Sequence, residues 1–248
     1  MPRRARQKSE TGIYHIVLRG VNRQTIFEDE EDNERYLSLL KRYKKTCGYK
    51  LYAYCLMNNH IHLLLKAENE SISVIVQRIA SSYVHWYNLK YCRVGHLYQS
   101  RFSSEPIDND RYFLAVLRYI HQNPVHAGLC KDAADYRFSS HQDYTECDSR
   151  LVDIEFVFSM MDKDAFISLN KEPVDIKCLD DDYMKIRLND VDAKAVMQEV
   201  SRCASAAEFQ SLSNNERNRY ITELKERGLS IRQISRLTGI SFAIVRKA

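Results

Sequence analysis

The chain has 248 residues, of which 44% are hydrophobic and 28% charged, and its formal net charge is +4 at pH 7. That length is enough for one large domain or two modest ones, and the hydrophobic content is enough for a buried core. No apolar run approaches the ~20 residues of a membrane-spanning helix. The basic start MPRRARQKSE lacks the apolar stretch of a secretory signal. We therefore expect neither a membrane protein nor a secreted one.

Seven cysteines are scattered along the chain, and none of them forms a CxxC pair. Their odd number and irregular spacing argue against a disulfide framework and against a zinc ribbon. Free thiols of this kind are typical of a reducing compartment, so we expect a cytoplasmic protein.

The charge is distributed unevenly. Residues 1–145 carry a net +6, residues 146–200 a net −7, and residues 201–248 a net +5. Two basic segments indicate two surfaces that could meet nucleic-acid phosphate, joined by a segment that should not. Three ordinary solvated surfaces are the alternative, and the charge alone does not decide between the two interpretations.

The first part of the chain alternates between strand and helix patterns. Residues 13–19 alternate like a strand, and residues 29–47 carry apolar side chains at helical spacing before Gly48, which is typical of a helix end. Residues 49–56 and 60–67 read as two strands joined by a short turn, so we expect them to pair antiparallel.

The pattern continues with a helix over residues 71–91, an extended stretch over 96–107, and a helix from Asp110 to about Gln122. Pro124 should end this last helix, because the residue before a proline avoids the helical region. The order β-α-β-β-α-β-α predicts an α+β fold, in which a ferredoxin-like antiparallel sheet has its helices on one face.

The second part of the chain is predicted to be helical. Residues 146–200 are acidic and irregular, and we expect a partly helical connector there. Within the C-terminal domain, residues 201–248, a helix over 231–237 is followed by a turn containing Gly239 and by a last helix that opens on Ser241. This pattern is typical of a helix-turn-helix DNA-binding domain. A plain three-helix protein-binding module is the alternative.

His60 and His62 are the first candidates for chemistry. Side chains two apart on a strand point to the same face, with their Cα atoms about 6–7 Å apart. Two imidazoles in that arrangement can hold one divalent cation, although a histidine pair on a strand is also an ordinary half-buried feature.

Tyr119 and Asn123 are the second candidates. Residues four apart on a helix share a face. A tyrosine hydroxyl can attack phosphorus when a metal polarises the phosphate, and the amide oxygen of Asn123 is a ligand type that suits Mg²⁺ or Mn²⁺. Since the chain has 16 tyrosines, composition alone would not select Tyr119.

Four runs occur in order over about residues 3–145: YHIVLRGVNRQTIF, YAYCLMNNHIHLLL, GHLYQSRF and YIHQNPVHAGL. Together they resemble the HUH-type single-tyrosine transposases, and in particular the branch of REP-associated tyrosine transposases. In that family two histidines flank a bulky apolar residue and ligate the metal, which maps onto His60 and His62. Asn58 departs from the pattern, because relatives commonly have proline there.

The resemblance implies a site and a reaction. It assigns Tyr119 as the nucleophile, and Asn123 as a further metal ligand because related enzymes have Gln or Asn four residues after the tyrosine. His121 is the alternative ligand. The implied reaction is cleavage and rejoining of single-stranded or hairpin DNA through a 5′-phosphotyrosine intermediate with Mg²⁺ or Mn²⁺. The oligomeric state is left open: the protein could be a homodimer with shared active sites, as in smaller relatives, or a monomer.

The basic side chains that we expect to contact DNA lie in three places. They are the N-terminal arm, the segments around the first strand and before the fourth, and the last helix: Arg3, Arg4, Arg6, Arg19, Arg23, Arg101, Arg246 and Lys247. Two other functions compete. One is a non-catalytic, sequence-specific DNA-binding regulator derived from a transposase. The other is a metal-dependent hydrolase, which the absence of an HExxH-type glutamate beside the histidines disfavours.

Overall fold

The computed structural model describes residues 6–147, 149, 151–172, 178, 190–203, 205–227, 229 and 231–247. The chain divides into two compact units, Met1–Asp181 and Asp182–Ala248. Within the described residues of the first unit, four strands form one antiparallel sheet: β1 (Ile13–Arg19), β2 (Lys50–Met57), β3 (His60–Lys66) and β4 (Ser103–Ile107). Their order across the sheet is β2-β3-β1-β4. This order and the antiparallel pairing confirm the predicted ferredoxin-like sheet.

The two central strands are buried on both faces, which explains their nearly continuous apolar sequence. In β1 and β3, Val17 lies opposite His62 and Ile16 lies opposite Leu63. Residues opposite each other share a face, so one face of β1 and β3 carries the histidines, while the other is aliphatic apart from Tyr14.

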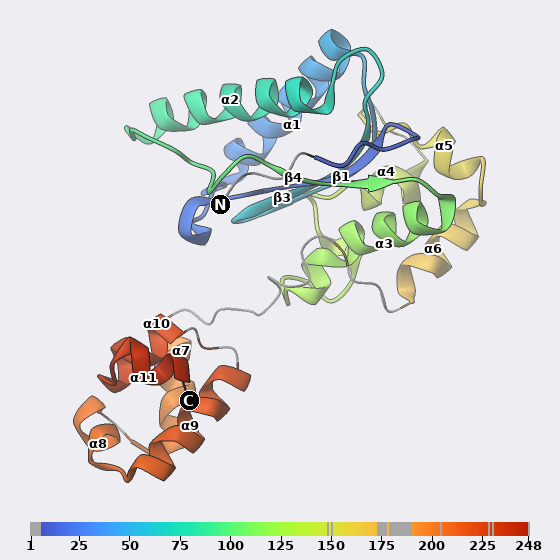
Figure 1. Ribbon diagram of the computed structural model, residues 1–248. Helices are drawn as coiled ribbons and strands as arrows, with labels where there is room; N and C mark the ends of the chain where they lie inside the picture. Colours follow the sequence, from blue (N-terminus) through green and yellow to red (C-terminus); the bar gives the residue numbers. More distant parts are fainter. Residues whose placement is uncertain are drawn as a thin grey trace. The chain divides into compact units, whose positions relative to one another are not determined.

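Helices α1 (Glu30–Cys47) and α2 (Ile72–Lys90) pack on each other and cover the apolar face, as Figure 1 shows. Helix α3 (Asp110–His126) lies against the opposite face, where it packs mainly on β2. Of the helices that we expected on one face of the sheet, α1 and α2 share the apolar face, whereas α3 does not. The histidine face of the sheet is therefore covered by α3.

Helix α3 does not end at Gln122, as the sequence had led us to expect. It continues through Pro124 to His126. A proline inside a helix removes one backbone hydrogen bond, but here it stands in the last turn, and its own carbonyl still accepts from Leu129 N at 2.9 Å. Asn123 consequently stays on the helix, one turn after Tyr119.

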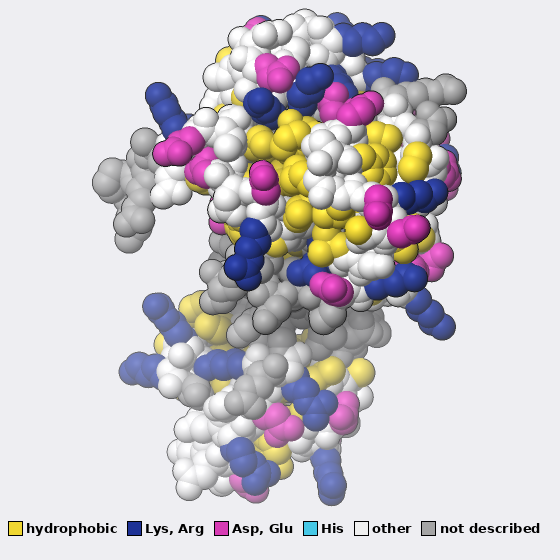
Figure 2. Space-filling model, turned by 90° about the vertical axis from the view of Figure 1, so that its right-hand side faces the viewer, with side chains coloured by type: hydrophobic (Ala, Val, Ile, Leu, Met, Phe, Trp, Pro, Cys, Tyr) yellow, Lys and Arg dark blue, Asp and Glu magenta, His cyan; other side chains and the backbone are white. Residues whose placement is uncertain are grey.

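The acidic segment 146–200, which we expected to be a connector, is divided between the two units. Short helices α4 (His141–Glu146), α5 (Glu155–Phe158) and α6 (Lys163–Lys171) belong to the first unit. Phe156 packs its ring on those of Tyr52 and Phe113, with centroids 4.9 and 5.1 Å away. Figure 2 faces the side of the first unit on which α5 and α6 lie in Figure 1, and apolar side chains reach the surface there. Buried aromatic contacts therefore hold this acidic stretch to the sheet and α3.

The second unit is all-helical in its described residues: α7 (Asp190–Ser201), α8 (Ala206–Ser211), α9 (Asn214–Glu226), α10 (Ile231–Thr238) and α11 (Phe242–Lys247). Its core includes Met197, Phe209, Ile234 and Val245. Gly239, with φ +68°, makes the turn between α10 and α11. No described helix of either unit has the length and apolarity that a membrane crossing requires.

Candidate functional site

The candidate site lies between β3 and α3. His60 and His62 point from β3 toward Asn123 of α3, as period-two alternation along the strand requires. The Nε2 atom of His60 lies 3.3 Å from Asn123 Oδ1, and Asn123 Nδ2 lies 3.2 Å from His62 Nε2. Both imidazoles thus turn the same nitrogen toward one amide.

The alternative ligand, His121, lies elsewhere. It is completely buried, its Nε2 lies 2.8 Å from Ser140 Oγ, and its ring packs against those of His141, Tyr144 and Phe166. His121 therefore belongs to the packing between α3, α4 and α6, and it does not reach the histidine pair.

Both histidines of the pair are neutral near pH 7. The pKa of His60 is lowered to about 3, mainly by burial and next by the positive charge of Arg19; the contact with Asn123 raises it, and Arg23 lowers it. Burial, followed by the neighbouring His60 and His15, lowers the pKa of His62 well below its ordinary value. A neutral imidazole is the form that ligates a metal.

The contacts of His60 fit a bound cation. Its Nδ1 lies 2.6 Å from Asn59 Oδ1, and its Nε2 faces Asn123 Oδ1. A neutral imidazole has one N–H and can donate to only one of these oxygens. If Nδ1 donates to Asn59, the lone pair of His60 Nε2 faces a lone pair of Asn123 Oδ1, and the two repel each other. A cation bound by both atoms would remove this repulsion.

The separation of the candidate ligands also fits. Two ligands that lie ~2.1 Å from a metal, at 90–109° to each other, are roughly 3.0–3.4 Å apart, and His60 Nε2 and Asn123 Oδ1 are 3.3 Å apart. Among the described residues, no group of three or more His, Cys, Asp or Glu side chains could hold a metal. A metal site here would accordingly need the Asn123 amide beside the two histidines.

Tyr119 lies one helical turn before Asn123, and its ring meets the His62 ring edge-on, with centroids 5.7 Å apart. Only 1% of Tyr119 is exposed. The structure therefore brings Tyr119 next to the histidine pair, and a phosphate can reach its hydroxyl only after that hydroxyl is uncovered.

Two residues beside the site, His15 and Glu105, were not predicted from the sequence. His15 Nε2 lies 3.1 Å from His62 Nδ1, and His15 Nδ1 lies 3.8 Å from Glu105 Oε2. The available signal was the histidine in the mostly apolar run IYHIVL, because a polar side chain on a strand buried on both faces needs a partner.

The predicted DNA-binding arginines of the first unit fall into two groups. Arg19 and Arg23 lie close enough to His60 for their charges to lower its pKa, because Gly20 N donates to Asn59 O and ties the loop after β1 to the β2–β3 turn. Arg6 stacks on Phe102 and donates to Ser73 Oγ at 2.9 Å. Burial lowers the pKa of Arg6, and the nearby positive charge of Arg101 lowers it as well. Arg3 and Arg4 lie outside the described residues.

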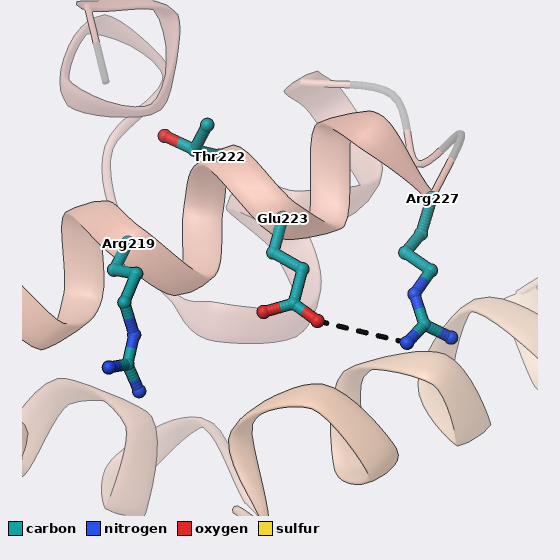
Figure 3. A pocket seen from close by; sticks show the side chains of 4 residues that line it. All are labelled: Arg219, Thr222, Glu223 and Arg227. Carbon is teal, nitrogen blue, oxygen red and sulfur yellow. Dashed lines mark ion pairs between the residues drawn. The ribbon is translucent and has the colours of Figure 1, made fainter.

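In the second unit, Arg246 and Lys247 are exposed on α11. An open pocket of about 600 Å³ lies along α9, where Arg219, Glu223 and Arg227 project to the same side (Figure 3). Arg227 forms ion pairs with Glu223 at 3.7 Å and with Glu199 at 3.1 Å. Glu223 and Glu199 thus balance part of the positive charge in this pocket.

A family model described as "Transposase IS200 like" matches residues 8–123, which include every element of the candidate site. A REP-associated tyrosine transposase solved with a REP hairpin has a similar fold, with a TM-score of 0.51 and 19% identity over 59% of this chain and 86% of that one. A protein titled as a transposase from Deinococcus radiodurans R1 is similar at 16% identity over 49% and 97% of the two chains; its TM-score of 0.35 carries no argument. No curated protein matches the chain. The matched model places residues 8–123, the part of the chain that holds the candidate site, in the IS200-like transposase family, and the solved structure shows that the fold is shared.

Proposed function

We propose that this transposase cleaves and rejoins single-stranded DNA through a covalent 5′-phosphotyrosine on Tyr119, at a divalent-metal site formed by His60, His62 and Asn123. The observation that carries the proposal is the convergence of three side chains from β3 and α3, with the Tyr119 ring packed on one of the ligands. Membership of a transposase family supports DNA as the substrate.

Each proposed ligand has a defined donor atom. His60 and His62 would offer Nε2, and Asn123 would offer Oδ1, a ligand set that suits Mg²⁺ or Mn²⁺. Bound there, the cation would polarise the scissile phosphate and stabilise the charge that develops on it.

Tyr119 would act as the nucleophile. Its hydroxyl gives up its proton as its oxygen forms a bond to phosphorus, the bond from phosphorus to the 3′ oxygen breaks, and that oxygen takes up one proton and leaves as a free 3′-hydroxyl. The reverse attack by a 3′-hydroxyl restores a phosphodiester and releases Tyr119. Because Tyr119 is buried, DNA binding must uncover its hydroxyl before the first step.

The proposed substrate is single-stranded DNA that carries a hairpin, by analogy with the REP hairpin bound to the similar solved protein. Arg19 and Arg23 lie beside His60 and would hold the phosphates that flank the cleaved one. Arg6 and Arg101 would contact the strand further away, as would Arg3 and Arg4.

The second unit would bind DNA as a helix-turn-helix domain. Helix α10, the Gly239 turn and α11 follow that pattern, and the exposed Arg246 and Lys247 would contact DNA from α11. We infer a cytoplasmic location because all seven cysteines are free thiols. The homodimer stays a prediction, to be tested by light scattering with and without DNA.

The test is a covalent-adduct assay. Full-length protein is incubated with a labelled library of single-stranded hairpins and Mn²⁺ or Mg²⁺, and denaturing gels separate free DNA from protein-linked DNA. Tyr119→Phe removes the proposed nucleophile. Tyr112→Phe, on the same helix but partly exposed, is the matched control.

We expect an adduct that requires metal, disappears with Tyr119→Phe and persists with Tyr112→Phe. An adduct that survives Tyr119→Phe would reject Tyr119 as the nucleophile. If no substrate gives an adduct while duplex DNA is bound tightly and independently of metal, the proposal fails in favour of the non-catalytic regulator.

A further inference from the structure

His15 lies near the middle of β1, completely buried on the same face of the sheet as His62. The two rings are stacked, with centroids 5.4 Å apart and planes 20° apart, and His15 Nε2 lies 3.1 Å from His62 Nδ1. The other nitrogen of His15 faces the Glu105 carboxylate on β4 at 3.8 Å. Three neighbouring strands thus place Glu105, His15 and His62 in a row that leads toward α3.

The hydrogen between the two rings has two alternative positions. If it is on His62 Nδ1, then His62 Nε2 carries a lone pair and His15 must accept at its Nε2. If it is on His15 Nε2, then the hydrogen of a neutral His62 moves to its Nε2 and blocks that atom from a cation. The position of this one hydrogen therefore decides whether His62 can be a ligand.

Two contacts favour the first arrangement. At 3.8 Å the Glu105 carboxylate is too far from His15 Nδ1 for a hydrogen bond, but its negative charge favours the His15 tautomer with hydrogen on Nδ1 and the lone pair on Nε2. On the other side of His62, the Asn123 amide nitrogen can only donate, and it lies 3.2 Å from His62 Nε2. Both neighbours therefore assign the hydrogen of His62 to Nδ1.

We propose that His15, whose Nδ1 faces the Glu105 carboxylate, is a positioning residue that fixes His62 in the tautomer with hydrogen on Nδ1 and so keeps Nε2 available to a cation. The ligand role of His62 rests on the proposed function, whereas its tautomer in the metal-free protein does not. His60 is fixed more locally, by Asn59 at 2.6 Å. His15 also packs edge-on against Tyr119, with centroids 6.0 Å apart, so the same ring supports both a ligand and the nucleophile.

The experiment reads the tautomer directly. Full-length metal-free protein with ¹⁵N-labelled histidine is examined at pH 7.5 by long-range ¹H–¹⁵N correlation spectroscopy, which identifies the protonated ring nitrogen. His15→Phe keeps a ring of similar size but removes the acceptor, whereas His15→Gln restores an acceptor oxygen. His85→Phe replaces an exposed histidine of α2 and is the control for labelling, folding and metal binding.

We expect hydrogen on Nδ1 of His62 in the wild type and in His15→Gln, and a mixture of tautomers in His15→Phe. Calorimetric titration with Mn²⁺ should show an affinity roughly 10–100-fold lower for His15→Phe, as is typical when the partner of a metal-bound histidine is lost. His15→Gln should recover most of that loss. If His15→Phe does not fold, Glu105→Leu on the edge strand should shift the tautomer in the same direction, and Glu105→Gln, which keeps an acceptor oxygen, should not.

A wild-type His62 with hydrogen on Nε2 would overturn the inference. So would a folded His15→Phe that keeps both the wild-type tautomer and the wild-type Mn²⁺ affinity. If the wild type neither binds Mn²⁺ nor forms an adduct, the proposed function fails, and the tautomer of metal-free His62 still decides the role of His15.

Discussion

Acid should destabilise the first unit through His60, and the structure sets the size of the effect. Burial lowers the pKa of His60 to about 3, whereas a histidine in the unfolded chain has a pKa of ~6.5. Between these values the unfolded chain binds a proton that the folded protein does not. Stability is therefore present above pH ~6.5 and is lost as the pH falls. For His60 alone, the expected loss between pH 7 and pH 5 is about 2 kcal/mol.

The measurement is urea unfolding at pH 7, 6 and 5, followed by the fluorescence of Trp86. This is the only tryptophan of the chain, and it lies on α2, so it reports on the first unit. His60→Gln removes one titrating group. His62 and His121, whose pKa values burial also lowers, remain in both proteins and contribute equally to the slope.

The quantity to compare is the loss of unfolding free energy between pH 7 and pH 5, because His60→Gln also changes the unfolding free energy at neutral pH. Wild type should lose about 2 kcal/mol more than His60→Gln between pH 7 and pH 5. His85→Gln, at an exposed position, should keep the wild-type slope. Equal losses in wild type and His60→Gln would show that the folded protein does not withhold a proton from His60, and the electrostatic account of the site would be refuted.

Three further predictions concern a ligand, a packing contact and a turn. Asn123→Ala should lower the Mn²⁺ affinity roughly tenfold or more, whereas Asn123→Asp should retain it through a carboxylate oxygen; calorimetry that finds Asn123→Ala equal to wild type would exclude the amide as a ligand. Phe156→Ala should lower the free energy of unfolding of the first unit by about 2 kcal/mol, because its half-buried ring packs on two aromatic rings; a loss within error in urea unfolding would contradict this packing. Gly239→Ala should cost about 1–2 kcal/mol, because φ is +68° and the new Cβ would meet the Gln210 side chain; an unchanged thermal midpoint would argue against a left-handed turn.

Local patterns in the sequence were sufficient to predict the sheet and to predict which candidate site residues lie together on one strand or one helix. The period of two predicted that His60 and His62 share a face, and the spacing of four placed Tyr119 and Asn123 together on one helix. The choice between Asn123 and His121 could not be made from the sequence. It depends on whether Pro124 breaks the helix, and surrounding packing overrides the local preference of the residue before a proline.

Contacts between distant segments could not be predicted from the sequence. His15 meets His62 only because β1 pairs with β3 in a register that places Val17 opposite His62, and no local pattern gives that register. The acidic segment was misjudged for a related reason. Its charge suggested a solvated connector, but charge describes the exposed face of a helix, and three buried or half-buried residues decide where α5 and α6 pack: Phe156, Val157 and Phe166.

That packing bears on the candidate site, because α3 carries both Tyr119 and Asn123 and is held from two sides. On one side it covers the histidine face of the sheet. On the other, Gln122 Nε2 donates to the backbone oxygens of Asn170 and Glu172 at the end of α6, and Arg118 pairs with Glu172 at 3.0 Å. Tyr119 and Asn123, the proposed nucleophile and the proposed amide ligand, lie one turn apart on α3, so a shift of α3 that uncovers Tyr119 would also move Asn123 relative to His60. The contacts with α6 should limit that shift, so we expect the acidic segment to affect how far the proposed site can open to DNA.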